Sequence, residues 1–440
     1  MKSGLLNFLS KLRGSYWYIP SMMAIAALLL SILSLRLDHL FVVDWLESWG
    51  WFRASNQEGA RTILSTIATS MITVGGVTFS ITIVAVAFAG SQVGPRLTTN
   101  FMRDKANQIT LGTFIATFLY CLFILLALFN ANKNGVTDTD GLAFIPQISL
   151  LIAILLTISS ISVLIYFIHH IPESINISNI IAQVGEELYR QVTCQFPTNI
   201  GKEVVNKLID IPVIYEKHVT VTATDRGYIR ILDGRSLLDI ATKNDLIIQL
   251  EVRTGAYITE DLPLLTIYSS RKIEDAIKNK CIETFAVGHK RNQEQDILFL
   301  IDEMVEIIAR ALSPGINDPF TAMNCFDWLQ SILLKISKTS PPSPYRFDSE
   351  NKLRLITKPI VFDEFCDFVF IRVQPYVCKD RNATFHMMAM IISMYKNILN
   401  QEHKVILRSY ATSLKKAAVD NLLIEEDRKK LINLYEMNFN

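Results

Sequence analysis

The sequence lacks the short motifs that mark most enzymes and metal proteins. It has no GxxxxGK[ST] phosphate loop, no identifiable Ser/His/Asp set and no carboxylate pair within an apolar run, so we expect neither an enzyme nor an ATP-driven pump. No CxxC pair and no histidine at zinc-ligand spacing is present, so we expect no metal site. The six cysteines stand far apart, which fits a reduced cytoplasmic compartment: Cys121, Cys194, Cys281, Cys325, Cys366 and Cys378.

Blocks of basic residues are also missing. The net charge is only +1, so nothing in the sequence indicates nucleic-acid binding. The chain is 50% hydrophobic, and nearly all of its long uncharged runs lie before His169, whereas charges recur every few residues after Glu173. Composition therefore divides the chain into a membrane half and a half typical of a soluble protein.

Four apolar runs are long enough to cross a lipid bilayer as helices, at residues 19–35, 61–90, 109–129 and 148–168. No small-residue cleavage site follows the first run, so we interpret it as a retained span and not as a signal peptide. Short cytoplasmic loops carry an excess of Lys and Arg, and here the N-terminal tail and the loop after the second span carry it. We expect a multi-pass protein of the bacterial inner (plasma) membrane with both termini cytoplasmic.

The second span has no charge after Arg61 and would be about 45 Å long as a helix. Small and hydroxyl residues recur in it at alternating steps of four and three, which places them on one narrow stripe: Thr62, Thr66, Thr69, Thr73, Gly76 and Ser80. Two interpretations stay open. The stripe lines a pore or substrate path, or it packs closely against a neighbouring helix.

A hinge is predicted behind this span, because Gly94 and Pro95 cannot continue the helix. We expect the segment from Arg96 to Lys105 to run along the cytoplasmic interface, with Arg96 or Arg103 paired to a protein acid or helix C-terminus; anchoring to lipid phosphate is the alternative. At the end of the fourth span stand His169 and His170. Adjacent helical positions point about 100° apart, so an interfacial or helix-capping role is favoured over a shared metal.

Several motifs together resemble one family of bacterial membrane proteins. They are Ser-Tyr-Trp-Tyr-Ile-Pro-Ser at 15–21, Met71 to Ser80, Ser91 to Arg96, Asn100 to Asp104, and Ala311-Leu-Ser-Pro-Gly-Ile-Asn-Asp-Pro319. The family is catalogued as domain of unknown function 2254. The resemblance implies an integral inner-membrane protein with this layout, and it brings no activity with it.

In the second half, residues 218–270 alternate apolar and polar residues with turn signals between them. The related segments Gly227-Tyr228-Ile229 and Gly255-Ala256-Tyr257-Ile258 look like the two halves of a small barrel-sandwich of the biotinyl type. No carrier lysine motif stands in a turn, so we expect no covalent cofactor and assign the barrel a structural or adaptor role.

The segment 296–312 predicts an amphipathic helix that buries Ile297, Ile301, Met304, Val305, Ile308 and Leu312 and exposes Asp302, Glu303, Glu306 and Arg310. Five residues of the motif that follows are singled out: Ser313, Pro314, Gly315, Asn317 and Asp318. Pro314-Gly315 ends the helix, and Asp318 is expected to cap the next helix, with proline at its first position. We interpret the motif as a corner between two helices; the alternative is that Asn317 and the helix amides bind an anion.

The expected fold is thus a membrane domain of four transmembrane helices plus a cytoplasmic α+β region with a small barrel-sandwich-like segment and a helical C-terminal part. The predicted boundaries are 1–172 for the spans, 173–217 for a connecting helical segment, 218–270 for the barrel, 271–338 for the corner domain, 339–351 for a linker and 352–440 for the C-terminal helices. In the last part we expect helices at 359–374, 383–399 and 407–434, with a core face of Phe365, Phe368, Val369 and Ile371.

Two hypotheses about function follow. In the first, the protein forms a homo-oligomeric, channel-like passive conduit lined by the stripe, because four spans are too few to enclose a wide path alone. In the second, it is a membrane-anchored sensor or scaffold whose cytoplasmic domain binds a protein partner.

Overall fold

The computed structural model of the chain describes residues 16–40, 57–94, 104–133, 145–192, 200–203, 215, 217–339 and 342–439. The chain divides into two compact units. Of the described residues, the membrane unit comprises 16–40, 57–91, 104–133 and 145–176, and the C-terminal unit comprises 92–94 and those from 177 onward.

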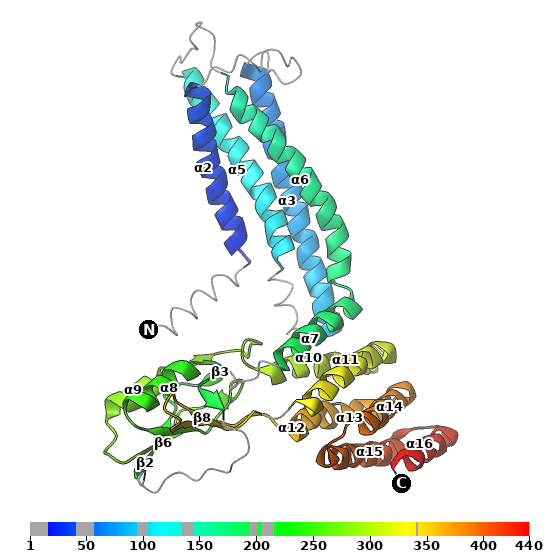
Figure 1. Ribbon diagram of the computed structural model, residues 1–440. Coiled ribbons are helices and arrows are strands. Elements are labelled where there is room, and N and C mark those ends of the chain that lie inside the picture. Colours follow the sequence, from blue (N-terminus) through cyan, green and yellow to red (C-terminus); the bar gives the residue numbers. More distant parts are fainter. Residues whose placement is uncertain are drawn as a thin grey trace. The chain divides into compact units, whose positions relative to one another are not determined.

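Four long helices form the described part of the membrane unit (Figure 1): α2 (Tyr18–Leu40), α3 (Gln57–Val93), α5 (Lys105–Lys133) and α6 (Gln147–Ser174). Each contains a stretch long and apolar enough to cross a membrane, so the four predicted spans are confirmed as helices. The helices extend beyond the apolar runs because flanking polar residues also continue the backbone hydrogen bonding.

The helix α5 is the most enclosed of the four. In its apolar stretch 50% of the residues are buried, against 22–28% in the other three helices. It packs against both α2 and α6. The buried cluster around it is filled by Tyr120, Cys121, Ile124 and Leu128 of α5, with residues of the other three helices. The interior of the described bundle is therefore occupied by side chains.

Two sheets lie in the C-terminal unit. The six-stranded sheet has the order β1-β8-β9-β4-β6-β2, and the three-stranded sheet has the order β5-β3-β7. The strands are β1 (Lys202–Glu203), β2 (Lys217–Thr222), β3 (Gly227–Leu232), β4 (Ile247–Leu250), β5 (Tyr257–Ile258), β6 (Pro263–Ser269), β7 (Phe285–Gly288), β8 (Tyr345–Phe347) and β9 (Leu353–Ile356). A common apolar core includes side chains from both sheets and from α8 (Gly234–Lys243) and α9 (Asp275–Ile282).

The barrel-sandwich detail is not confirmed, because the sheets do not close. The two repeated segments do pair with each other, with Gly227 opposite Ile258 and Tyr228 opposite Tyr257. However, α8 interrupts the strands, capped by Asp233, whose side chain accepts from the amide of Ser236. The six-stranded sheet also takes β8 and β9 from the distant residues 345–356, part of which we expected to be a linker.

The remaining helices of this unit are α7 (Ile177–Gln191), α10 (Ile297–Ala311), α11 (Pro319–Lys338), α12 (Phe362–Cys366), the π-helix η3 (Asp367–Ile371), α13 (Arg372–Val377), α14 (Arg381–Asn397), α15 (Gln401–Asn421) and α16 (Glu425–Phe439). α7 is amphipathic, because Ile180, Ile181, Val184 and Leu188 are buried on one of its faces. α7 packs on α10 and α11, and α14 packs on α11 and α15.

The C-terminal helices differ from the expectation in two places. The π-helix η3 carries one extra residue per turn, so Phe370 is buried while Ile371 is 54% exposed. The expected helix 407–434 is broken after Asn421. There, Arg428 donates its Nε hydrogen to the carbonyl of Leu422 at 2.5 Å, and the acids of the first turn of α16 favour a new helix start.

The contact between α12 and α15 predicts how the stability of the C-terminal unit depends on pH. The ring of His403 stacks on Phe362, with centroids 4.1 Å apart, and burial lowers the pKa of His403 below its ordinary value of 6.5. The folded state thus favours the neutral ring, so its contribution to stability is complete above about pH 6.5 and is lost as the pH falls below that value. We expect the denaturant midpoint of the C-terminal unit to be lower at about pH 5.5 than at about pH 7.5.

His403→Phe should remove this part of the pH dependence. His289→Gln, at an exposed position, is the matched control and should retain it. An unchanged pH dependence in His403→Phe would contradict the assignment.

Candidate functional site

The six residues of the predicted stripe all lie on the exposed face of α3. The face of α3 that packs on the membrane unit consists instead of Ala60, Leu64, Ala68, Met71, Gly75, Thr78, Thr82, Ala85 and Ala89. At about 100° per residue this second set lies on the opposite side of the helix. The stripe therefore does not pack against the other helices in the described part of the chain, and it does not line the interior of the bundle.

The two adjacent glycines of α3 illustrate this division. A Cβ atom placed on Gly75 would lie 3.2 Å from Cβ of Phe114 in α5, so this glycine permits close helix contact. A Cβ atom placed on Gly76 would meet nothing within 4 Å. Gly76 therefore belongs to an open surface.

Four of the stripe hydroxyls donate hydrogen bonds to carbonyls one turn earlier in α3. The donor–acceptor distances are 2.9 Å for Thr62, 2.7 Å for Thr66, 2.8 Å for Thr73 and 3.0 Å for Ser80. Their hydrogens are thus satisfied within the helix, and the remaining oxygen lone pairs face outward. Such a surface tolerates lipid, and it can also accept hydrogen bonds from water.

A buried polar cluster, which the sequence analysis did not predict, joins α2, α5 and α6. Asp38 accepts from the amide of Ile148 at 2.7 Å and from that of Ser149 at 3.0 Å, so it caps the start of α6. The buried hydroxyl of Tyr120 donates to Ser34 at 2.9 Å. These polar groups are hydrogen-bonded to one another, so we interpret the cluster as a structural link between the three helices.

At the other end of α6, Nε2 of His170 lies 2.6 Å from Oδ2 of Asp104, which immediately precedes α5. The ring of Tyr166 stacks on His170. Nε2 of His169 points to Glu173 at 3.4 Å on its own helix. The two histidines thus have different partners, and no group of three potential metal ligands occurs among the residues that the structure describes.

The predicted hinge is described only at Gly94, which has a φ of +107°. A Cβ atom on Gly94 would lie 2.8 Å from Cδ of Glu306 and 3.1 Å from Nε of Arg310, both on α10 in the same compact unit. The backbone just after α3 therefore lies against the side chains of Glu306 and Arg310, which form an ion pair. Pro95, Arg96 and Arg103 lie outside the described residues.

The corner motif adopts the predicted geometry. Asp318 caps α11 by accepting from the amide of Thr321 at 3.2 Å, with proline at the start of the helix. Asn317 has a positive φ of 51°, and its amide donates to the carbonyl of Ser313 at 2.9 Å. The hydroxyl of Ser313 donates to the carbonyl of Arg310 at 2.6 Å. Pro314 and Gly315 are exposed between the two helices.

Helix α10 differs from the expectation on its polar face. The pair Glu306–Arg310 is present, with Oε1 and Nε 3.4 Å apart. However, Asp302 and Glu303 are 5% and 2% exposed, not solvated. Asp302 is buried because it forms ion pairs with two arginines from outside α10: Arg291, at 2.5 Å, and Arg372.

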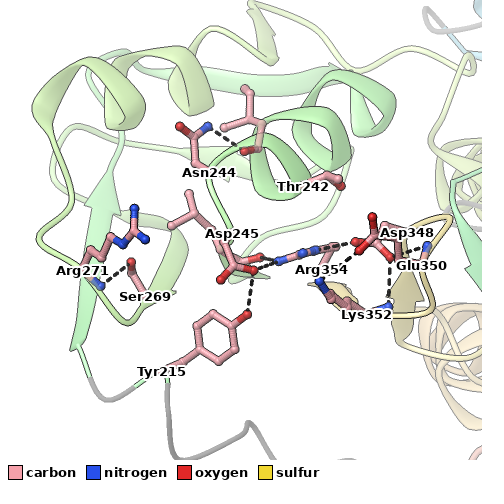
Figure 2. A network of polar contacts seen from close by, with 12 residues as sticks. Tyr215, Thr242, Asn244, Asp245, Ser269, Arg271, Asp348, Glu350, Lys352 and Arg354 are labelled. Carbon is pink, nitrogen blue, oxygen red and sulfur yellow. Dashed lines mark hydrogen bonds and ion pairs between the residues drawn. The ribbon is translucent and has the colours of Figure 1, made fainter.

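A second ion network holds the six-stranded sheet (Figure 2). Arg354 of β9 is almost fully buried and lies between two carboxylates, with Nε 2.7 Å from Asp348 and Nη1 2.8 Å from Asp245. The hydroxyl of Tyr215 also donates to Asp245, at 3.1 Å. Hydrogen bonding from Arg354 lowers the pKa of Asp245, so this carboxylate stays ionised at neutral pH.

The network has a structural explanation. Asp348 also accepts from the amides of Glu350 and Lys352, both at 2.9 Å, and so fixes the turn between β8 and β9. Asp245 has a positive φ of 52° in the turn before β4, to which β9 pairs in parallel. Arg354 thus joins the turns that bring β4 and β9 together.

We compared the chain, with its four apolar helices and mixed C-terminal unit, with known protein families. The model of a family described as "Predicted membrane protein (DUF2254)" matches residues 13–393. The chain belongs to this family. The matched residues include the four apolar helices and most of the C-terminal unit, with the corner motif.

Curated relatives come from mycobacteria. "Uncharacterized protein Rv1290c" of Mycobacterium tuberculosis and "Uncharacterized protein Mb1321c" of Mycobacterium bovis are each 25% identical to this chain over 434 residues. Each alignment covers 96% of this chain and 80% of the relative. No solved structure matches the chain.

Proposed function

We propose that the protein is a homo-oligomeric, channel-like membrane protein in which copies of α3 surround a shared passive path. The observation that supports this is the position of the stripe, which lies on the outer face of α3 and opposite its packing face. The described interior of one bundle is filled by side chains such as Tyr120 and Leu128. The proposal therefore requires a path between copies and not within one.

The stripe also sets the chemistry of the path. It presents hydroxyl lone pairs and a bare glycine but no charged side chain, so it favours small neutral or weakly hydrated solutes and does not select strongly by charge. In this proposal the protein is not an enzyme, needs no cofactor and has both termini in the cytoplasm. Arg96 lies outside the described residues, and the proposal expects it near the inner mouth of the path.

Thr73→Leu is the first test of this function. In proteoliposomes we expect it to reduce solute flux severalfold, because a bulky apolar group replaces a hydroxyl at the middle of the path. Ile72→Leu is the matched control: Ile72 is exposed on the same helix, and its side chain points about 100° away from that of Thr73. Equal flux in both variants and the parent, together with a strictly monomeric mass in detergent, would contradict the proposal.

The scaffold function is the second candidate, and one observation favours it. Three large apolar side chains near the C-terminus are almost fully exposed in the described structure, Leu399 by 91%, Leu423 by 93% and Met437 by 84%. Isolated exposure of this kind is common, but three instances, in the two loops that flank α15 and on α16, suit a protein contact. A pull-down with full-length protein should then recover one soluble partner, and Leu423→Ser should lose it.

A further inference from the structure

Three cations of α15 share one face of that helix. Lys404, Arg408 and Lys415 are spaced by four and seven residues, so their side chains leave the helix within about 40° of one another. In the part of the chain that the structure describes, no carboxylate forms an ion pair with any of the three. On the neighbouring α16, by contrast, Lys429 is paired with Glu425 at 2.8 Å. The face of α15 thus carries positive charge that no protein acid balances.

Two of these cations meet at one buried phenol. Tyr435 of α16 is 6% exposed, and its hydroxyl oxygen lies 2.8 Å from Oγ1 of Thr412 on α15. Nζ of Lys415 lies 3.9 Å from the centroid of the Tyr435 ring. Hydrogen bonding to Thr412, together with the nearby charges of Arg408 and Lys415, lowers the pKa of Tyr435 below its ordinary value of 10. The phenol therefore lies in a positive electrostatic field.

A row of aromatic rings supports this face. The ring of Phe439 contacts that of Tyr435, with centroids 5.1 Å apart, and that of Tyr395 on α14, with centroids 4.9 Å apart. Nζ of Lys404 lies 5.4 Å from the centroid of Tyr395. Ammonium groups are attracted to the faces of aromatic rings. The rings therefore hold Lys404 and Lys415 on the surface on which Arg408 also lies.

The acidic side chains of α15 and α16 lie away from this face. The acids from Glu425 to Asp427 stand in the first turn of α16, at least about 12 Å along the helix from Tyr435. Glu436 is exposed and points about 100° away from Tyr435. On α15, Glu402 and Asp420 are exposed and lie on the side opposite Lys404. An anion bound between the cations would relieve their mutual repulsion.

We propose that Arg408 and Lys415 form a binding site for the phosphoryl group of a soluble phosphorylated ligand. The planar guanidinium group of Arg408 can donate two parallel hydrogen bonds to phosphate oxygens, and Lys415 supplies a second positive charge for a dianion. Lys404 adds charge one turn away. Arg408 is exposed, so a ligand can reach it from solvent. A carboxylate carries only one negative charge and suits this pair of cations less well.

The test uses the full-length chain in a maltoside detergent and phosphate-free buffer, with 3-fluorotyrosine incorporated in place of Tyr435. Inorganic phosphate is added at constant ionic strength, at a pH at which it is a dianion. We expect a saturable change in the fluorine chemical shift. Bound phosphate should also raise the pKa of the fluorinated phenol, because it offsets the field of the two cations. Potassium chloride at the same ionic strength should produce neither change.

Arg408→Gln and Lys415→Gln should each weaken phosphate binding severalfold. Lys416→Gln is the matched control, because Lys416 is exposed on α15 and points about 100° away from Lys415. Denaturant midpoints of the three variants check that each of them folds. A parent protein without a saturable response, or an equal loss of binding in Lys416→Gln, would overturn the proposal. A response to phosphatidylglycerol micelles but not to phosphate would assign the site to a lipid headgroup and would also overturn it.

Discussion

Arg354→Met is expected to destabilise the C-terminal unit by about 3–5 kcal/mol, because it leaves a buried carboxylate without its partner. The side chains of Arg354 and Asp348 are each only 3% exposed, with Nε and Oδ2 2.7 Å apart. Methionine matches the apolar stem of arginine and isolates the loss of charge. Denaturant unfolding of the purified protein, followed on the C-terminal unit, measures the change.

Arg271→Met is the matched control. Arg271 is exposed at the end of β6 in the same region of Figure 2, so we expect its substitution to change the unfolding free energy by no more than about 0.5 kcal/mol. Similar losses in the two variants would show that the network around Arg354 contributes nothing specific.

Gly255→Ala is expected to destabilise the same unit by about 2–4 kcal/mol, from overpacking and from a disfavoured backbone conformation. Gly255 has a φ of +83°, and a Cβ atom there would overlap the carboxylate of Asp296, with Oδ1 2.8 Å away. Asp296 cannot move aside easily, since it is 4% exposed and paired with Arg291 at 2.7 Å while it caps α10.

Gly315→Ala serves as the control for this substitution. A Cβ atom on Gly315 meets nothing within 4 Å, so a change of no more than about 0.5 kcal/mol is expected. The difference in midpoint between the two alanine variants, measured under identical conditions, decides the point. If Gly255→Ala unfolds with the parent midpoint, the packing argument fails.

The membrane helices and the corner could be predicted because local sequence determines them. Long uncharged runs require helical hydrogen bonding in a membrane, and Asp318-Pro319 supplies both a cap and a compatible first residue. The direction in which the stripe of α3 points could not be predicted. Small residues occupy both faces of this helix, so only the positions of the other helices show which face is buried.

The pairing of the strands in the sheet could not be predicted either. Alternation located strands in residues 218–270, but a strand pattern does not specify its partner, and β4 pairs with β9 from more than a hundred residues away. The buried acids of α10 escaped prediction for the same reason. Asp302 is buried only because Arg291 and Arg372 reach it from other segments.

Two polar ties of the membrane unit also connect distant segments. Ser31, Ser34 and Asp38 follow helical spacing on α2, which is a signal that the sequence does contain. Ser149, the partner of Ser34 and Asp38, stands at the start of α6, and nothing local indicates that contact. The pair of Asp104 and His170 likewise required the fold.

The most direct test of the central claim is the water accessibility of the stripe. In a Cys194→Ser background, Thr73→Cys and Ile72→Cys proteins in sealed vesicles are treated with a small, membrane-impermeant thiol reagent. The proposed shared path predicts that Thr73→Cys is modified and that Ile72→Cys, whose exposed side chain points about 100° away from Thr73 on the same helix, is not. A stripe that faces only lipid would leave both thiols unmodified, and that result would contradict the account.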